Sequence, residues 1–572
     1  MITRYAIVTL VLFFLSTIFV IQSLSFHVSL PFIGKRKVTI GLMTAPIMAI
    51  AILWASQCLG ATQIRNGIVG TDNIKPYNIL ILFISLAYMA ITLDVTGILQ
   101  AAAFWVSNKG GSSGRKLYFY FYLLLTLISM IVGNDPVILS GTVFLVYYTA
   151  ATGLNPDAWL ISEFAAANTA SMVLFVGNPT NVVICEGFRI NNAAFTAYTI
   201  LPFVACSIAC YLVLMLQYRN EKHVPRKLKV SGHLNPREVL RDPVSAIFGS
   251  IWLAICLIVV IVLSFFHVDV WKVVLPFAGG KFIFDICWDH YRYSTGKIPK
   301  FNEKKPGAES ADDPIATAMR RALSEDMQRN NTTNTFNNAL QHHDTNGTLD
   351  FFPEPNSDDS GTNSTKTILN GMPRSESPLP SPASAPPPKF IPKLRSGLSL
   401  KYRELAAHFP TFFTALPRLP FGLIPFAFSQ FILIEALEHQ GWINIFSRWL
   451  VIASNRQMMP VIWLVGVFGV ILCNISGTNI GATILLTKII RASAFEESTA
   501  RAAAVSLAVA SNIGAVSFTF SASLAGLLWI AILKDKGIKI KQWKFAMWNA
   551  LPLFAMTGVG LGVVSAMMAV LY

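Results

Sequence analysis

The chain has 572 residues, of which 53% are hydrophobic and only 13% are charged. A soluble protein of this length carries about a quarter charged residues, so the composition excludes a soluble globular protein. The net charge of +15 comes from basic residues gathered in short loops beside apolar segments. That distribution follows the positive-inside rule of membrane proteins and argues against nucleic-acid binding.

The N-terminal region, residues 1–76, is expected to hold transmembrane helices. The apolar stretch Ala6–Leu24 has no small-residue cleavage site after it, so it is interpreted as a retained helix rather than a signal peptide. Similar apolar stretches recur along the chain and match a hydrocarbon core of about 30 Å. We therefore predict an all-α polytopic membrane protein, in the plasma membrane or an internal membrane.

Residues 77–217 contain two polar interruptions of apolar sequence. The first is Gly133-Asn134-Asp135-Pro136, in the middle of the apolar run 117–150, and the second is Gly177-Asn178-Pro179-Thr180-Asn181. Non-helical backbone persists at membrane depth only where it lines a protein cavity. These sites are therefore expected to be the turn of a re-entrant hairpin, at 133–136, and the break of an interrupted helix, at 177–181.

The middle of the chain separates two halves. Residues 218–243 form a basic loop, and residues 244–289 are predicted to be transmembrane helices. Residues 290–404 are polar and rich in Ser, Asn and Pro, and they cannot bury enough apolar surface to offset their conformational entropy. This long loop is predicted to be disordered.

Residues 411–572 repeat the organisation of 77–217. Three blocks recur in the same order at a nearly constant offset; one pair is "VGNDPVILSGTVFL" at 132–145 and "LCNISGTNIGATIL" at 472–485. The second half thus has a predicted hairpin tip at 474–479 and a predicted helix break at 517–525. Internal repeats of this kind are common in secondary transporters.

The positive-inside rule predicts that the two repeats are inverted. If the first hairpin enters and leaves on one side, then the basic segments 107–116, 218–241 and 532–544 and the loop 290–404 all share one face, which is the cytoplasmic face. The two hairpins then enter from opposite faces. A topology in which 117–150 simply crosses the membrane would put 218–241 on the wrong side.

The four interruptions are the candidate sites for chemistry. Half-helix N-termini at such breaks suit anions or oxygen-rich solutes, and exposed carbonyls suit a coupling cation. Asp135 is the first candidate for a group that carries a proton or binds a cation, and Glu435 is the second. The plain structural alternatives stay open: proline kinks, and amides that tie helices together. Asn168 and Asn512 occupy equivalent positions and are equally compatible with either role.

These motifs resemble the ion transporter superfamily, in its arsenical-pump (arsenite permease) and citrate/sodium:proton permease branch. The resemblance rests on "VGNDPVIL", "AAANTASMVLFVGNPTNVV", "NISGTNIGATIL" and "SNIGAVSFTFSASLAGLLW" and covers about 77–217 and 411–570. It implies two inverted repeats, each with a re-entrant hairpin and an interrupted helix whose tips meet at the substrate site, and it suggests a homodimer. The residues that it places at the substrate site are Asn134, Asp135, Gly177, Asn178, Pro179, Thr180, Asn181, Asn474, Thr478, Asn479, Ser521, Ser523 and Ala525.

The chain departs from the dicarboxylate pattern, in which both tips carry Ser-Asn-Thr. Here the tips read Gly-Asn-Asp and Cys-Asn-Ile. An aspartate at a tip repels a multiply charged anion, so the sequence favours proton-coupled export of a neutral metalloid hydroxide, such as arsenous or silicic acid, or of a small anion. A carboxylate symporter and a sodium/proton antiporter remain alternatives, with a proton or sodium as coupling ion.

Other classes of protein fit less well. A membrane enzyme would need an acid pair, an HExxH motif or a Ser/His arrangement at depth, and none is visible in the sequence. The seven cysteines show no metal-ligand spacing, so no metal and no cofactor are expected. A channel would lack saturable counter-transport, and a regulatory role would depend on the loop 290–404.

Overall fold

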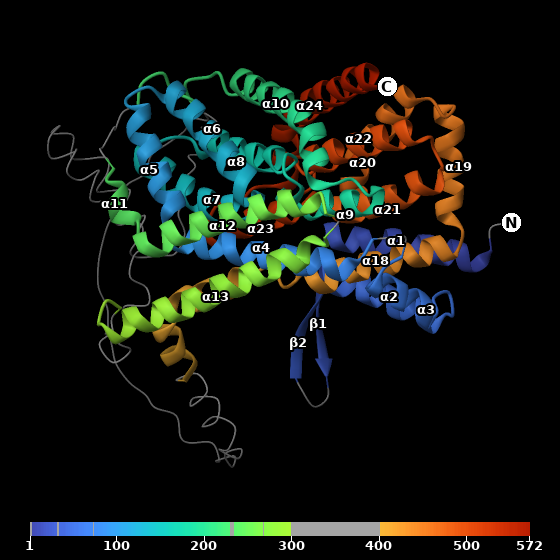
Figure 1. Cartoon of the computed structure of the whole chain (residues 1–572), viewed down its shortest axis with the longest axis horizontal. Helices are drawn as coiled ribbons and strands as arrows, with labels where there is room; N and C mark the ends of the chain where they lie inside the picture. Colours follow the sequence, from blue (N-terminus) through green and yellow to red (C-terminus); the bar gives the residue numbers. More distant parts are fainter. Residues whose placement is uncertain (1–2, 31–33, 72–73, 229–233, 267, 299–400) are drawn as a thin grey trace, which may run out of the picture.

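The computed structural model describes residues 3–30, 34–71, 74–228, 234–266, 268–298 and 401–572. In these residues the chain is helical except for one β-hairpin, and the helices pack into a single layered body (Figure 1). The predicted polytopic helical fold is confirmed. Most of the loop predicted at 290–404 lies outside the described residues.

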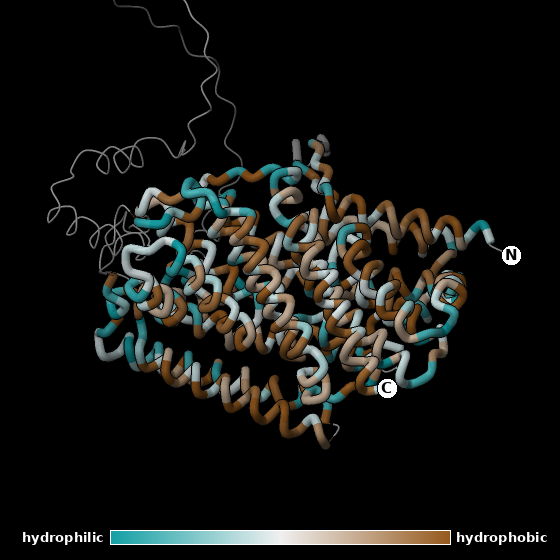
Figure 2. Tube along the Cα trace, turned by 90° about the horizontal axis from the view of Figure 1, so that it is seen from above, coloured by the Kyte–Doolittle hydropathy of each residue, from teal (hydrophilic) through white to brown (hydrophobic). Residues whose placement is uncertain are grey.

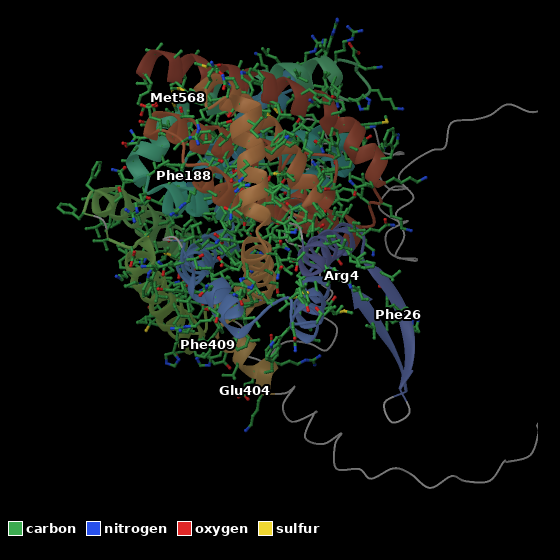
Figure 3. The ribbon with its side chains drawn as sticks, turned by 90° about the vertical axis from the view of Figure 1, so that its right-hand side faces the viewer. Arg4, Phe26, Phe188, Glu404, Phe409 and Met568 are labelled. Atoms are coloured by element: carbon green, nitrogen blue, oxygen red, sulfur yellow. The ribbon has the colours of Figure 1, made fainter. Side chains whose placement is uncertain are left out.

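The N-terminal region differs from the expectation of helices alone. It comprises α1 (Arg4–Ile21), β1 (Leu24–Leu30), β2 (Gly34–Ile40), α2 (Thr44–Ala55) and α3 (Ala61–Val69). The strands pair antiparallel from Leu24↔Ile40 to Leu30↔Gly34. The hairpin projects from the helical body, and Phe26 lies on β1 in the part nearer the body (Figures 1 and 3). Polar and apolar residues alternate in "LSFHVSL" with the two-residue period of a strand, and "GKRKVTI" pairs with it along its whole length.

The first half consists of two helices, a helical hairpin, an interrupted helix and a long final helix. Its elements are α4 (Pro76–Val95), α5 (Ile98–Gly110), α6 (Gly114–Val132), α7 (Asn134–Thr152), α8 (Pro156–Ala170), η1 (Phe175–Gly177), α9 (Pro179–Phe188) and α10 (Asn192–Gln217). Phe121 of α6 packs on Phe144 and Tyr148 of α7, with ring centroids 5.5 Å apart in both pairs. Helices α6 and α7 therefore fold back on each other at Gly133.

The second half repeats these kinds of element in the same order. Its elements are α18 (Leu423–His439), α19 (Trp442–Ser454), α20 (Met458–Ile475), α21 (Asn479–Ala492), α22 (Glu497–Ile513), η5 (Phe520–Ala522), α23 (Leu524–Asp535) and α24 (Gln542–Leu571). Gly469 of α20 faces Leu486 of α21, so these two helices also fold back on each other. The unwound segment runs from Gly514 to Ser523, slightly earlier than the predicted 517–525.

The contacts between the two halves occur in equivalent pairs. When a helix of the first half contacts a helix of the second, the counterparts of these two helices also contact each other in the following cases. Helix α7 contacts α23, and its counterpart α21 contacts α9; helix α10 contacts α22, and α24 contacts α8. Helices α10 and α24 pack along each other, as Figure 1 shows at the top of the view. Such exchange is what a two-fold axis between the halves would produce.

The linking segment contains α11 (Pro236–Val239), α12 (Pro243–Ser264), α13 (Val270–Ser294), α17 (Pro410–Ala415) and η4 (Leu416–Arg418). Two boundaries differ from the sequence analysis. Helix α13 continues to Ser294, beyond 289, and residues 401–408 are helical, so both edges of the predicted loop 290–404 are ordered. Helix α13 is also too polar to count among the candidate spans.

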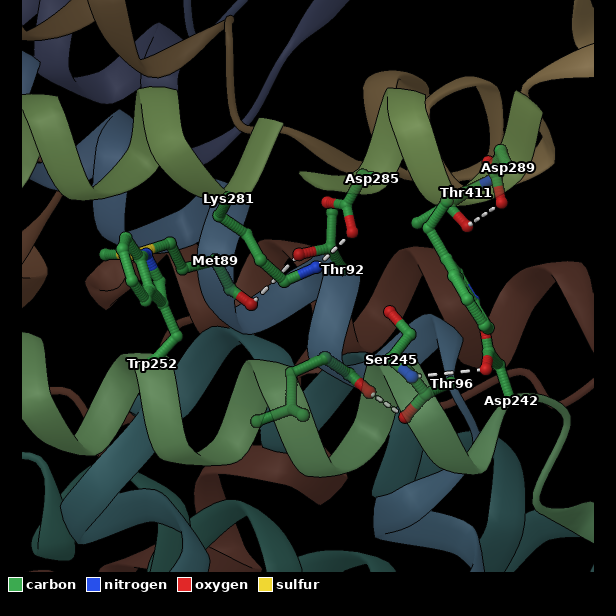
Figure 4. A network of polar contacts seen from close by, with 12 residues as sticks. Met89, Thr92, Thr96, Asp242, Ser245, Trp252, Lys281, Asp285, Asp289 and Thr411 are labelled. Carbon is green, nitrogen blue, oxygen red and sulfur yellow. Dashed lines mark hydrogen bonds and ion pairs between the residues drawn. The ribbon is translucent and has the colours of Figure 1, made fainter. Parts of the chain in front are cut away.

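Buried charges hold α13 to the body. Lys281 and Asp285 form an ion pair in which each side chain is 1% exposed, and the Tyr88 hydroxyl of α4 donates to Asp285 over 3.0 Å. Further along, the Asp289 carboxylate accepts two hydrogen bonds from Thr411 of α17 (Figure 4). The i,i+4 spacing of Lys281 and Asp285 is visible in the sequence and is the signal of this ion pair.

The surface of the body is apolar in the way that a lipid environment requires. By length and hydropathy, eight helical segments of the described chain are able to cross a membrane: α1, α4, α6, α10, α12, Pro410–His439, α20 and α24. On α10 the exposed residues Val204, Ile208, Leu212 and Leu216 recur every four positions and form one stripe. Hydrophobic residues cover the outer helices in Figure 2.

Candidate functional site

The first hairpin tip is sharper than the sequence suggested. Only Gly133 is non-helical, with a φ of +84°, a conformation that favours glycine. Asn134, Asp135 and Pro136 form the first turn of α7, where the missing proline N–H leaves no hydrogen bond broken. A Cβ at position 133 would lie 3.3 Å from the Gly177 carbonyl oxygen, so the tip touches the break of the first interrupted helix.

The first helix break covers residues 171–178, earlier than the predicted 177–181, because Pro179 already begins α9. The break is held by its own polar side chains. Asn178 caps α9, because its Oδ1 accepts from the Thr180 N–H over 3.2 Å. The Asn181 amide donates to the carbonyls of Ser171 and Leu174, both at 2.9 Å. These bonds satisfy carbonyls of the unwound segment, which would be costly to leave unpaired at membrane depth.

The second hairpin tip contacts the second break in the same way. Asn474, in the last turn of α20, donates to Ser517 Oγ over 2.7 Å and accepts from the backbone N–H of Phe518 and Thr519. Thr478 caps α21 by accepting from the Gly481 N–H. In each half the hairpin is thus joined to its own interrupted helix.

Ser523 and Ser521 behave differently. Ser523 caps α23, since its Oγ accepts from the Gly526 N–H over 3.0 Å. Ser521 is buried and has a single long contact, 3.5 Å, to Thr519 Oγ1. Of the sequence candidates at this break, Ser523 therefore has a clear structural task and Ser521 does not.

Amides also join the two halves. Asn512 of α22 donates to Asn181 Oδ1 over 2.8 Å and accepts from the Ser171 hydroxyl over 2.8 Å. Asn479 donates to the Ser511 carbonyl, and Thr180 lies 3.4 Å from Ser511 Oγ. Asn512 therefore ties the halves together.

Asn168, the counterpart of Asn512, does not bridge the halves in this way. Its Oδ1 accepts from the amide of Asn134 over 3.1 Å, so it holds the first hairpin tip. Its own amide donates to the Phe164 carbonyl one turn earlier. The repeats are thus equivalent in fold but not in hydrogen bonding.

The four half-helix N-termini lie close to one another, as the contacts Gly133–Gly177, Thr180–Ser511–Asn479 and Ala482–Ala522 show. Their helices lie between the α10–α24 pair and the layer of α4, α13 and α18 (Figure 1). These N-termini are the starts of α7, α9, α21 and α23, and each follows a break or a tip. Each N-terminus carries roughly half a positive charge from its unpaired N–H groups. Together they create a region that favours anions or oxygen atoms with lone pairs.

Asp135 is the charged residue at this centre. Its side chain is partly buried, and among the described residues no side chain pairs with it by a hydrogen bond or an ion pair. A carboxyl without a partner at such depth is costly unless a proton, a cation or a substrate group satisfies it.

Glu435 is not at the centre. It accepts from Thr71 Oγ1 over 2.6 Å and pairs with Lys488 Nζ at 2.5 Å, and Glu438 pairs with the same lysine. Lys488 lies about 13 Å along α21 from Asn479. The structure thus places Glu435 in a separate buried ion cluster and does not bring it to Asp135.

Glu163 is a further buried acid, and it is not among the residues predicted from the sequence. This residue lies on α8 and is 0% exposed. Its carboxyl meets Thr142 of α7. An acid inside the small-residue run "SEFAAANTA" was the available signal.

Comparison with known proteins places these elements in a family. The sequence profile of the citrate transporter family, CitMHS, matches residues 2–288. The arsenical pump membrane protein of Escherichia coli is 24% identical over 260 residues, which cover 44% of this chain and 59% of that protein. The protein of the same name from Yersinia enterocolitica is 27% identical over 263 residues, with the same coverage. The chain thus spans about three-fifths of the length of these relatives.

Among solved structures, the YdaH transporter of Alcanivorax borkumensis matches over 99% of this chain and 98% of its own, with 12% identity and a TM-score of 0.44. The family match extends over half of the chain, from the N-terminal helices through the first hairpin and the first interrupted helix to α13. The chain belongs to the citrate transporter family of membrane proteins.

Proposed function

We propose that the protein is a secondary active transporter that exports a metalloid hydroxide or a small anion in exchange for protons. The observation that carries this proposal is Asp135, a carboxyl without a protein partner among the described residues, at the point where half-helix N-termini gather. A titratable group beside an anion-favouring centre couples substrate binding to protonation, because each changes the local charge that the other meets.

The chemistry of the centre favours a substrate with several hydroxyl groups. Asn134, Asn178, Asn181, Asn474 and Asn479 supply amide donors and acceptors around the tips and breaks. Gly177, Thr180, Thr478, Ser521 and Ser523 complete the candidate substrate site. A neutral hydroxide would accept and donate hydrogen bonds here without opposing the charge of Asp135. The names of the E. coli and Yersinia relatives, arsenical pump membrane proteins, support arsenite as the first compound to test.

A carboxylate is the second candidate, and the description of the family supports it. The matching family is described as citrate transporter. The positive ends of α7, α9, α21 and α23 would attract a carboxylate, provided that Asp135 is protonated or binds a cation such as sodium. A sodium/proton antiporter would use Asp135 as the exchanging carboxylate.

Alternating access would follow from the arrangement of the two halves. Each hairpin is bonded to the interrupted helix of its own half, through Asn134–Asn168 and Asn474–Ser517. Inverted repeats with a shared central site would open to one side and then the other by exchanging the roles of the halves. The proposal includes a multi-pass location in the lipid bilayer, basic loops on the cytoplasmic side and a homodimer.

The test is a substrate panel on the purified full-length protein in proteoliposomes. Arsenite, silicic acid, citrate and sodium would be offered under imposed pH and sodium gradients. Uptake of arsenite or silicic acid that responds to the pH gradient supports the proposal. Uptake of citrate driven by sodium selects the alternative, and saturation with counter-transport distinguishes a carrier from a channel.

A further inference from the structure

Glu163 occupies a closed niche between three helices. It lies in the middle of α8, and both of its carboxyl oxygens lie 3.0 Å from Thr142 Oγ1 of α7. A Cβ at Gly141 would come within 2.5 Å of Glu163 Oε1, so the carboxyl rests directly on the backbone of α7. The niche exists because residue 141 has no side chain.

The groups facing this carboxyl are neutral. Helix α7 contributes Thr142 and Gly141, α6 contributes Leu125 beside Gly141, and α23 contributes the buried indole of Trp529. Among the described residues, no Lys, Arg or His pairs with Glu163, and no other acid interacts with it. A buried carboxylate without a cation is strongly unfavourable.

The hydrogen bonding leads to the same conclusion. The Thr142 hydroxyl has one proton and can donate to only one carboxyl oxygen at a time. The indole of Trp529 is the other donor beside the carboxyl, and two neutral donors do not offset a full negative charge in a buried site. A protonated carboxyl fits this niche, with one oxygen accepting from Thr142 and the acid O–H available to the threonine oxygen.

Thr142 is also connected to the candidate substrate site. It follows Asp135 by about two helical turns on the same face of α7, which is about 10 Å along the axis. Since α7 is an arm of the hairpin whose tip holds Asp135, a separation of α7 from α8 that breaks the Asn134–Asn168 hydrogen bond would expose Glu163. The niche is therefore placed to sense the position of the hairpin.

We propose that Glu163 carries a proton in the transport cycle: it is protonated while Thr142 of the hairpin covers it, and it releases the proton to water when the hairpin moves away. The step breaks the carboxyl O–H bond and transfers that proton to a water molecule, and the reverse step restores it from water. This role rests on the proposed function, because it requires that the hairpin moves during transport.

The test compares Glu163→Gln with Glu497→Gln in full-length protein. Glutamine keeps the shape of the side chain and cannot release a proton. Glu497 is a matched control, since it lies on α22 in an exposed i,i+4 pair with Arg501. In proteoliposomes with arsenite, and in parallel with citrate, we expect Glu163→Gln to lose pH-gradient-driven transport by at least about tenfold. Exchange of labelled substrate without a gradient should remain, and Glu497→Gln should behave as the wild type.

A second readout reports the proton directly. The infrared spectrum of the wild type should contain the carbonyl-stretch band of a buried protonated carboxylic acid, and Glu163→Gln should lack it. If the wild type transports arsenite or citrate, and Glu163→Gln keeps the same response to the pH gradient, the proton-carrying role is wrong. The transporter function then still stands. Absence of the band from the wild type also overturns the proton-carrying role. If the wild type transports neither arsenite nor citrate, the proposed function is overturned instead, whatever the infrared band shows.

Discussion

The amide of Asn512 donates to Asn181 Oδ1 over 2.8 Å, and this bond joins residues 331 positions apart in the interrupted helices of the two halves. Asn512 also accepts from Ser171, so a single side chain binds both ends of the first unwound segment to the second half. Both asparagines are completely buried. The bond makes the relative position of the two halves dependent on one amide.

Replacing Asn512 with Ala should therefore destabilise the protein by about 1–2 kcal/mol, because Asn181 and Ser171 each lose a buried partner. The measurement is thermal unfolding of purified protein in detergent. Asn549→Ala is the matched control: that asparagine is equally buried on α24, but its amide has no hydrogen bond within the described part of the chain. Equal losses of thermal stability in Asn512→Ala and Asn549→Ala would contradict the bridging role of Asn512.

Asp135→Asn should abolish coupled transport while the protein still folds and is expressed. The amide keeps the size of the carboxyl but cannot change charge, so the pH gradient would no longer drive substrate movement. The measurement is substrate flux in proteoliposomes at several imposed pH gradients. Asp269→Asn, which removes a partly exposed carboxylate paired with Lys272 at 2.9 Å, should leave flux unchanged. A pH-dependent flux in Asp135→Asn equal to that of the wild type would exclude the assignment.

Lys488→Met should destabilise the fold by about 3 kcal/mol, because it leaves the buried Glu435 carboxylate without its cation and beside the partly exposed Glu438. The triple variant in which both glutamates also become Gln should recover most of that loss, since no uncompensated charge remains. Lys272→Met breaks an exposed pair and should cost less than about 1 kcal/mol. The denaturation midpoints of the wild type and these three variants test the prediction. No recovery in the triple variant would mean that the lysine acts through packing.

Gly177→Ala should prevent normal folding of the first helix break. A Cβ at this position would lie 2.4 Å from the Ser171 carbonyl oxygen, and backbone atoms cannot yield as a flexible side chain can. We expect a large loss of folded protein by size-exclusion chromatography. Gly279→Ala on α13, where nothing lies within 4 Å, should be tolerated and should stabilise its helix slightly. Wild-type behaviour of Gly177→Ala would show that the segment can rearrange.

The approximate positions of the breaks could be predicted because breaks are local events. Glycine, proline and side chains that cap helices interrupt a helix wherever they cluster, so Gly133-Asn134-Asp135-Pro136 and the Asn178-Pro179 step could be identified without knowing any distant contact. The predicted first and last residues of the breaks were less accurate. The unwound segment before α23 begins at Gly514, where a Cβ would meet Cys473 of another helix at 2.6 Å.

By itself, the sequence determined that the chain is a polytopic helical membrane protein with two similar halves, because hydrophobic length and helix-breaking residues act within one segment. Tertiary structure alone decided which polar groups meet. Lys488 lies next to Glu435 and away from Asp135, Asn512 lies next to Asn181, and Glu163 lies under Thr142. In a membrane interior, where water cannot satisfy a polar group, the partner that packing supplies fixes its role, and that partner comes from a distant helix.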